Sequence, residues 1–228
     1  MAGAAAFDLN AACTGFIYAL AAAKHMMQGG MARYALVIGA DMCSAVVDYQ
    51  DRATCVLFGD GAGAVVLGPV SEGRGILGEY IAADGSGADL IRIPAGGSRK
   101  PASAETIANR EHFIVMAGNE VFKFAVKILG ESVEKALEGT GCTVADIDYL
   151  APHQANIRII QTAAKRFGMP MERVLCNIER YGNTSGATIP LVLAEAAEEG
   201  KLKDDQLIAL VGFGAGMTWG ATIVRWGR

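Results

Sequence analysis

The sequence contains two copies of one pattern of elements, and this internal repeat limits the possible folds more than any other feature. The stretch CTGFIYALAAAKHMMQGG followed by YALVIGAD (13–41) matches TSGATIPLVLAEAAEEGK followed by LIALVGFG (184–214) in element order and in one glycine near each helix start. A further strand closes each copy, GAVVL in the first and GATIV in the second. Strands that alternate with helices indicate an α/β fold. We therefore expect two related α/β halves, with helices on both faces of mixed, mostly parallel sheets.

The segment between the copies, from 73 to 110, is rich in Gly, Ser and Pro and predicts loops. We place the boundary there, which gives an N-terminal half over 1–110 and a C-terminal half over 111–228. Apolar patterning predicts the elements within these halves. Strands are expected at 5–9, 33–41, 63–70, 146–153, 173–179, 205–213 and 219–226, and helices at 13–29, 114–138, 156–167 and 184–200.

The two copies differ in what precedes them. The second copy has a helix, a strand and a helix over 114–172 before its matching strand, whereas the first has almost nothing before Phe7. A parallel sheet without those elements would expose strand edges and apolar faces. We therefore expect that the first half is incomplete and that the sequence starts inside a longer protein.

Composition excludes several classes of protein. The chain has 228 residues, 52% of them hydrophobic, and a formal net charge of -4. These values fit a globular enzyme with a substantial core and do not suggest a nucleic-acid-binding protein. The N-terminal residues lack a secretory leader pattern, and no apolar run approaches the ~18 residues needed to span a membrane. We expect a cytoplasmic protein without a membrane partner.

The five cysteines are widely spaced and odd in number, which argues against a disulfide framework and a structural zinc site. Cys43, Cys55, Cys142 and Cys176 suit the ordinary role of small buried apolar residues. Cys13 differs because it stands among small residues at the start of the predicted helix. Backbone N–H groups and the helix dipole at such a position favour a thiolate. The sequence therefore predicts that Cys13 is a nucleophile.

A nucleophilic cysteine needs polar partners, and His153 and Asn183 are the candidates. His153 ends the strand DYLAPH, where α/β folds present ligand-contacting groups, whereas His25 and His112 lack such a setting. Asn183, in YGNTSGATIP, precedes a helix that the repeat superposes on the helix after Cys13. The two residues should therefore face each other near a pseudo-twofold axis, and Cys, His and Asn together suit nucleophilic catalysis.

The glycine-rich stretch GFGAGMTWG has two interpretations. Taken alone, the stretch is explained equally well as a tight turn between two strands and as part of a binding site. Beside the three candidate residues, its backbone N–H groups would form an oxyanion site together with the N–H of Cys13.

Four motifs in order, NAACTGFIYAL, APHQANIRII, YGNTSGATIP and GFGAGMTWGATIVRW, resemble bacterial β-ketoacyl-acyl-carrier-protein synthase III, a condensing enzyme of the thiolase-like superfamily. The resemblance covers essentially the whole sequence. It implies a thiolase-like fold and an acyltransferase that condenses acetyl-CoA, or another short acyl-CoA, with malonyl-acyl-carrier protein to start type II fatty-acid synthesis. It also implies a homodimer and no metal or redox cofactor, coenzyme A thioesters being substrates.

The resemblance assigns roles to individual residues. Cys13 would be acylated, His153 and Asn183 would hydrogen-bond the malonyl thioester carbonyl, and the backbone N–H groups of Cys13 and Ala215 would hold the oxyanion. Phe213 and Met116 would line the acyl pocket. Contacts with coenzyme A and its pantetheine arm are expected from Arg52, Gly118, Asn119 and Asn156, and docking of the carrier protein from Lys123, Arg158, Lys165 and Arg166. Without the resemblance, the last group would suit an ordinary solvated helix face.

Two alternatives stay open at this point. One is a related enzyme of secondary metabolism that uses another primer or a non-carrier acceptor. The other is an inactive fragment or scaffold that needs the missing N-terminal elements, because in the family those elements supply further coenzyme A contacts, part of the sheet and part of the dimer interface.

Overall fold

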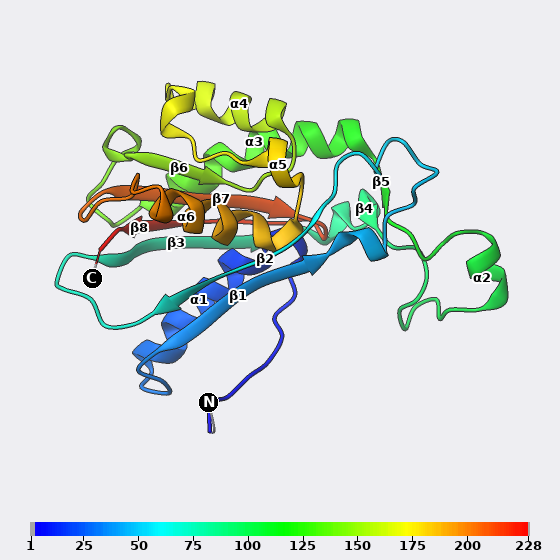
Figure 1. Ribbon diagram of the computed structural model, residues 1–228, viewed down its shortest axis with the longest axis horizontal. Coiled ribbons are helices and arrows are strands. Elements are labelled where there is room, and N and C mark those ends of the chain that lie inside the picture. Colours follow the sequence, from blue (N-terminus) through cyan, green and yellow to red (C-terminus); the bar gives the residue numbers. More distant parts are fainter. Residues whose placement is uncertain (1–2, 228) are drawn as a thin grey trace.

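A computed structural model describes residues 3–227 and shows an α/β fold built in layers (Figure 1). Its helices are α1 (Gly15–Gln28), α2 (Ala104–Ala108), α3 (Gly118–Leu137), α4 (Ile157–Arg166), α5 (Ile178–Tyr181) and α6 (Thr188–Glu198). Its strands are β1 (Ala35–Met42), β2 (Asp60–Leu67), β3 (Gly75–Ala83), β4 (Ile91–Arg92), β5 (Val115–Met116), β6 (Tyr149–Pro152), β7 (Leu207–Gly214) and β8 (Thr218–Arg225).

The largest sheet has the strand order β3-β8-β7-β6 and is covered by helices on both faces. On one face α3 and α4 pack over it, around buried residues such as Leu129, Ile160 and Ile223. On the other face α1 and α6 form a second core, in which Phe16 and Ile189 are buried. The expectation of helices on both faces of a sheet is therefore confirmed.

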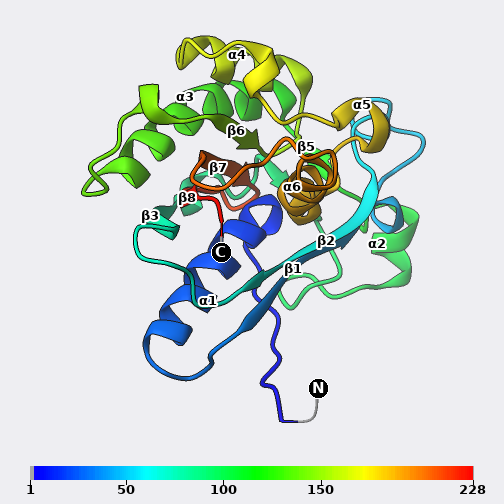
Figure 2. The ribbon, with the colours of Figure 1, turned by 60° about the vertical axis from the view of Figure 1, so that its left-hand side comes forward.

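The strands β1 and β2 form a separate antiparallel pair on the far side of α1 and α6. Figure 2 shows these two helices between the pair and the four-stranded sheet. The apolar, alanine-rich sequences of α1 and α6 suit this middle layer, because both helices must pack against elements on two sides. Two glycines allow the close approach: a Cβ on Gly39 would lie 2.2 Å from the carbonyl oxygen of Gly186, and one on Gly63 would lie 2.8 Å from the backbone nitrogen of Leu191.

The internal repeat is visible in the structure. A 3-10 turn precedes each central helix, η1 (Ala12–Thr14) before α1 and η6 (Ser185–Ala187) before α6. Each helix is followed by an antiparallel strand pair, β1 with β2 and β7 with β8. The two halves thus place η1 and η6, the turns that carry the candidate site, against each other.

Three expectations about strands were wrong. Residues 5–9 form no strand, because no strand among residues 3–227 lies beside them to complete a ladder. In 173–179, Val174 makes a single parallel bridge to Leu150, and the chain then turns into α5. Pairing is also mostly antiparallel, since β6 with β7 is the one parallel pair among the named strands of the described chain.

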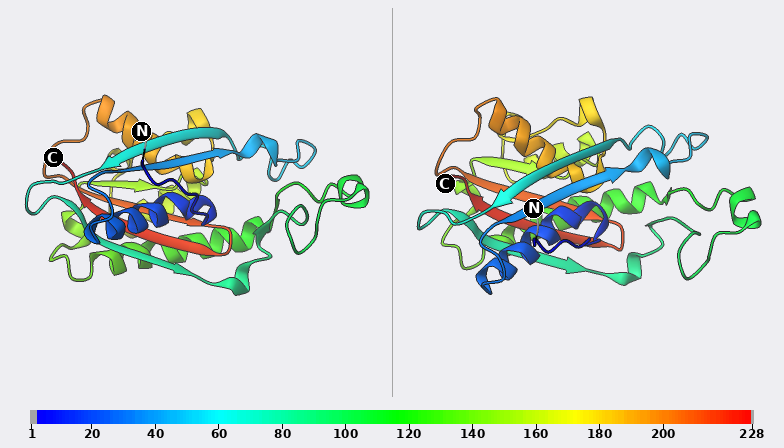
Figure 3. Two further views of the ribbon diagram at one scale, coloured as in Figure 1. Left: turned by 90° about the horizontal axis from the view of Figure 1, so that it is seen from below. Right: turned by 60° about the horizontal axis from the view of Figure 1, so that its bottom comes forward.

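The stretch 73–110 also differs from the loops that its composition predicts. It contains β3, which pairs along its length with β8, so the large sheet crosses the expected boundary at residue 110. Further along, residues 84–92 stay against the turn between β7 and β8 and include β4, and the part around α2 projects from the body of the molecule (Figure 3). Helix α3 begins at Gly118, later than expected, because the short strand β5 pairs with β4 first.

Candidate functional site

The candidate site lies where η1 and η6 meet. The Sγ atom of Cys13, which is half-buried in η1, lies 3.4 Å from the hydroxyl oxygen of Ser185 at the start of η6. In the same region the backbone N–H of Gly186 donates to the carboxylate of Asp41, at the end of β1, over 2.8 Å. The turns η1 and η6 therefore meet at the thiol. Each turn leads into a helix whose first backbone N–H groups point toward the site.

Asn183 is buried just before η6, and the loop ahead of β2 holds its backbone. Its N–H donates to the carbonyl of Leu57, and its carbonyl accepts from the N–H of Gly59. Its side-chain oxygen accepts the N–H of Ser185 at 2.8 Å. Because a backbone N–H can only donate, this bond fixes the orientation of the amide. The NH₂ group of Asn183 thus remains as a donor.

His153 is buried directly after β6. Its backbone N–H donates to the carbonyl of Val211 on β7 over 2.7 Å, and its Nδ1 atom lies 2.7 Å from the hydroxyl oxygen of Thr188 on α6. Its ring meets that of Phe213 edge to face, with centroids 5.6 Å apart. Burial lowers the pKa of His153 to about 3, so the ring is neutral at pH 7.

The turn between β7 and β8 closes the site from a third side. A Cβ on Gly214 would lie 2.7 Å from the backbone nitrogen of Cys13, so this position needs a residue without a side chain. The next residue, Ala215, is half-buried. The hydroxyl of Thr218 has the carbonyl of Ala11 within 2.9 Å and that of Ala215 within 3.2 Å as alternative acceptors for its one proton. The nearer contact ties the turn to the chain just before Cys13.

The structure contradicts one expectation about the thiol. We predicted that the helix start would favour the thiolate, but burial raises the pKa of Cys13 to about 11 and the Asp41 carboxylate adds to the rise. The hydrogen bond from Ser185 and the backbone N–H of Cys13 itself act in the opposite direction, and burial outweighs them. Cys13 is therefore a protonated thiol at neutral pH.

The other predicted site residues lie at varying distances from this centre. Phe213 is buried and contacts both His153 and Phe124, and Met116 on β5 is half-buried beside Gly118. The predicted contacts to coenzyme A lie on exposed or half-exposed turns, with Arg52 in the loop before β2, Gly118 and Asn119 in the first turn of α3, and Asn156 capping α4.

The predicted docking residues Lys123, Arg158, Lys165 and Arg166 are exposed on α3 and α4. Arg166 differs from the rest because it donates to the carbonyl of Lys127 and pairs with Glu134 at 3.5 Å. Its guanidinium thus fastens α4 to α3.

Sequence patterns alone did not assign roles to Ser185, Thr188 and Asp41. Ser185 and Thr188 are hydroxyl residues at a helix start in an otherwise apolar stretch, and Asp41 ends a strand. Both positions are typical of ligand-contacting groups in α/β folds and could have drawn attention.

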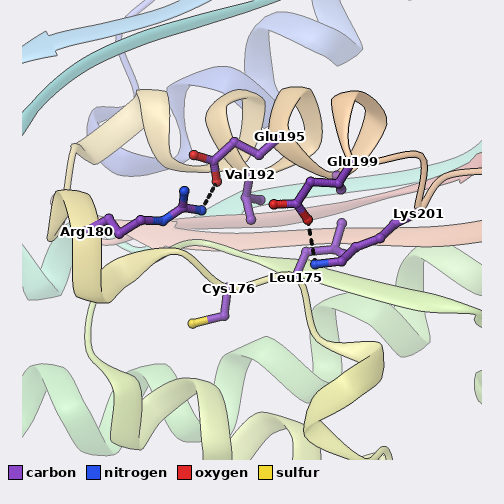
Figure 4. A pocket seen from close by; sticks show the side chains of 8 residues that line it. Leu175, Cys176, Arg180, Val192, Glu195, Glu199 and Lys201 are labelled. Carbon is purple, nitrogen blue, oxygen red and sulfur yellow. Dashed lines mark hydrogen bonds and ion pairs between the residues drawn. The ribbon is translucent and has the colours of Figure 1, made fainter.

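A separate small pocket lies between α6 and the segment leading into α5 (Figure 4). It is lined by Leu175, Cys176, Arg180, Val192, Glu195, Ala196, Glu199 and Lys201. Arg180 pairs with Glu195 at 2.6 Å and Lys201 pairs with Glu199 at 2.7 Å, so its charged groups pair with one another. None of the three candidate residues lines it.

Comparison with known proteins places this geometry in a family. The family model described as 3-Oxoacyl-[acyl-carrier-protein (ACP)] synthase III matches residues 7–85, and the model for its C terminal matches residues 137–226. Beta-ketoacyl-[acyl-carrier-protein] synthase III of Symbiobacterium thermophilum is 54% identical over 99% of this chain and 68% of its own length. The chain belongs to the 3-oxoacyl-[acyl-carrier-protein] synthase III family.

Other members of the synthase III family are similar to this chain over almost its whole length. The protein of that name from Clostridioides difficile is 53% identical over 98% of this chain and 68% of its own length. The crystal structure of the Thermus thermophilus synthase III superposes with a TM-score of 0.88 at 44% identity, covering 97% of this chain and 68% of that one. The expected thiolase-like α/β fold is thereby confirmed, and the chain spans about two thirds of the length of these relatives.

Two further observations concern the described part of this synthase III chain. Among residues 3–227, His, Cys, Asp and Glu form no group of three or more that could hold a metal ion. No helix in that range is both long and apolar enough to cross a membrane.

Proposed function

We propose that the chain is an acyltransferase that condenses a short acyl-CoA, acetyl-CoA in the first instance, with malonyl-acyl-carrier protein to initiate fatty-acid synthesis. Membership of the synthase III family supports the reaction class. The observation that carries the proposal is the contact at 3.4 Å between the Cys13 thiol and Ser185, which joins the helix mouth bearing the nucleophile to the one bearing Asn183.

In the first half-reaction the sulfur of Cys13 attacks the thioester carbonyl of the acyl-CoA. The new S–C bond forms a tetrahedral oxyanion, and the backbone N–H groups of Cys13 and Ala215 would hold it. The bond to the coenzyme A sulfur then breaks, and the proton lost by Cys13 ends on that sulfur. Because the pKa of Cys13 is raised, loss of this proton is a substantial part of the barrier.

In the second half-reaction the malonyl thioester loses carbon dioxide, and negative charge develops on its carbonyl oxygen. The amide NH₂ of Asn183 is oriented as a donor by Ser185, and neutral His153 would be the second donor through Nε2–H. One such donor is worth about 3 to 4 kcal/mol of transition-state stabilisation. The enolate carbon then attacks the acyl group, and the released Cys13 thiolate takes up one proton from solvent.

Binding of the two substrates is assigned to the surface around the site. We expect Arg52, Gly118, Asn119 and Asn156 to contact coenzyme A and the pantetheine arm, and Phe213 and Met116 to border the acyl group. The exposed Lys123, Arg158 and Lys165 would receive the acidic carrier protein, with Arg166 contributing mainly to packing. A cytoplasmic homodimer without a metal or redox cofactor is part of the same proposal.

Intact-protein mass spectrometry after mixing with acetyl-CoA tests the first half-reaction. We expect one acetyl group on the chain and on Cys142→Ala, and none on Cys13→Ala. Release of carbon dioxide from malonyl-acyl-carrier protein tests the second half-reaction, and it should fall in His153→Ala and Asn183→Ala. Acetylation that persists in Cys13→Ala would overturn the assignment.

A further inference from the structure

An ion pair joins two segments that are far apart in the sequence. Asp48 belongs to the loop of residues 46–59 before β2, here called the Arg52 loop, and Arg110 belongs to residues 93–114 between β4 and β5, here called the α2 segment. The Nε atom of Arg110 donates to one carboxylate oxygen of Asp48 over 2.8 Å, and its Nη2 atom donates to the other. Such bidentate pairing fixes the orientation of the two groups as well as their distance.

The surroundings of this pair keep it charged and in place. Hydrogen bonds from Arg110 lower the pKa of Asp48 to about 2, so the carboxylate is ionised at neutral pH. The guanidinium carbon lies 5.0 Å from the centre of the Phe113 ring. The backbone of the same two segments is joined as well, because the N–H of Ile114 donates to the carbonyl of Val46 over 2.8 Å. The ion pair therefore acts between segments whose separation is already fixed.

Asp48 also determines the conformation of the Arg52 loop. Its Oδ1 atom accepts the N–H of Gln50 over 2.8 Å, and its backbone carbonyl accepts the N–H of Asp51 over 2.9 Å. Asp51 continues the pattern, because its carboxylate lies 2.7 Å from the hydroxyl oxygen of buried Thr54. Arg52 therefore lies in a run of turns, and the first aspartate of this run is the one that pairs with Arg110.

The other end of the Arg52 loop is attached to the candidate site. The carbonyl of Leu57 accepts from the N–H of Asn183, and the N–H of Gly59 donates to the carbonyl of Asn183. The loop is thus fixed at one end by Asn183 and at the other by Arg110. Between these points Arg52 is exposed, and within residues 3–227 its side chain makes no hydrogen bond or ion pair. Its guanidinium is therefore available to an anionic ligand.

We propose that Asp48 and Arg110 are positioning residues for the acyl-CoA substrate, and that their ion pair holds the Arg52 loop so that Arg52 meets the phosphate-bearing nucleotide. This role rests on the proposed function, in which Arg52 contacts coenzyme A. A loop already held in the binding conformation gains affinity, because that conformation need not first be selected. The α2 segment also leads through β5 into the first turn of α3, where Gly118 and Asn119 are expected to contact pantetheine. The pair thus joins the two parts of the chain assigned to the two ends of the substrate.

Binding of coenzyme A by calorimetry and acetylation of Cys13 by two thioesters test the proposal on the full chain. One thioester is acetyl-CoA, and the other is S-acetyl-N-acetylcysteamine, which has the thioester end without the nucleotide. Asp48→Asn keeps an acceptor for Gln50 but removes the charge, and Arg110→Gln removes the guanidinium. We expect each variant, and the double variant equally, to weaken coenzyme A binding about tenfold and to raise the half-saturating acetyl-CoA concentration by the same factor. The maximal rate, and acetylation by the short thioester, should stay within about twofold of the parent.

Three further variants separate positioning from a purely structural role. Arg52→Ala should weaken coenzyme A binding as Asp48→Asn does, and combining the two should cause no further loss, because Asp48 acts through Arg52. Arg110→Lys keeps the charge without the bidentate geometry and should lose less than Arg110→Gln. Asp205→Asn is the matched control, because Asp205 forms a similar bidentate pair with Arg74, at 2.8 and 2.9 Å, and should bind coenzyme A like the parent.

The remaining outcomes also decide the question. Binding of coenzyme A that is unchanged in both Asp48→Asn and Arg110→Gln overturns the positioning role. Equal losses with both thioesters, or losses that add to that of Arg52→Ala, overturn it as well. A parent chain that binds coenzyme A but is acetylated by neither thioester contradicts the proposed function, and the calorimetry then decides the positioning role by itself. A folded parent that binds no coenzyme A overturns the positioning role.

Discussion

The Nδ1 atom of His153 and the hydroxyl oxygen of Thr188 lie 2.7 Å apart, both buried, and this pair determines how the histidine can act. The hydroxyl has one proton and a second acceptor within reach, the carbonyl of Ser185 at 3.0 Å. If the proton goes to Nδ1, neutral His153 carries its own proton on Nε2 and donates from it. If the proton goes to Ser185, Nε2 presents a lone pair and would act as a base.

The proposed donor role requires the first arrangement, in which the Thr188 hydroxyl donates to Nδ1. We predict that nitrogen NMR of the labelled chain shows the His153 proton on Nε2. Thr188→Val removes the hydroxyl, so we expect the tautomer signature to change and decarboxylation of malonyl-acyl-carrier protein to slow by about tenfold or more, less than the ~10²–10³ that loss of a donor itself costs. Thr188→Ser keeps the hydroxyl and should resemble the parent. A proton found on Nδ1 would contradict the donor role.

The raised pKa of Cys13 predicts a specific pH dependence of its reactivity. Alkylation by iodoacetamide, followed at Cys13 by peptide mass mapping, should become about tenfold faster per pH unit from pH 7 to 10, because only the thiolate reacts. The hydroxyl of Ser185 lowers this pKa, so Ser185→Ala should slow the reaction several-fold at pH 8. Ser98→Ala, on an exposed loop, is the control. A midpoint below the ordinary thiol value of about 8.5 would show that burial does not dominate.

The lowered pKa of His153 makes the fold sensitive to acid. Below pH 6.5 the unfolded chain binds a proton at this residue, whereas the folded chain does so only near pH 3. The free energy of unfolding is therefore not reduced by this residue above pH 6.5, and it decreases as the pH falls from 6.5 toward 3. Between pH 6.5 and 4.5 this amounts to about 2 to 3 kcal/mol. Urea unfolding of the parent and of His153→Gln at both pH values should show a smaller loss in the variant, and equal losses would contradict the prediction.

Local patterns in the sequence were sufficient for the centre of the fold. The repeat located α1, α6 and the strands β1, β7 and β8, because periodicity within each segment determines these elements. Strand β3 was missed because its glycines resemble those of a loop and its partner β8 lies more than 130 residues further along the chain. The expected strand at 173–179 failed for the opposite reason, since its apolar residues do suit a strand but Asn177 begins a helical turn.

In the candidate site, too, some residues could be predicted from local sequence, whereas others gain a role only through contacts between distant segments. Cys13, His153 and Asn183 stand out as polar residues at the ends of elements, which sequence alone reveals. The hydroxyls that orient them, Ser185 and Thr188, become meaningful only when η1, η6 and β6 are brought together. The acidity of the thiol was predicted with the wrong sign, because helix position favours the thiolate and burial opposes it, and only the packed structure gives the extent of burial.

The close approach of Gly214 to Cys13 leads to a last prediction. A methyl group at position 214 would stand 2.7 Å from the backbone nitrogen of Cys13 and 3.1 Å from that of Thr14, so either η1 or the turn after β7 must move. We expect Gly214→Ala to cost about 1 to 3 kcal/mol of stability in urea unfolding. Acetylation by acetyl-CoA should fall more steeply, because both proposed oxyanion donors belong to the displaced segments. Gly97→Ala, whose added methyl would meet nothing within 4 Å, should leave both quantities unchanged. Parent-like acetylation of Gly214→Ala would show that this approach does not position the oxyanion donors.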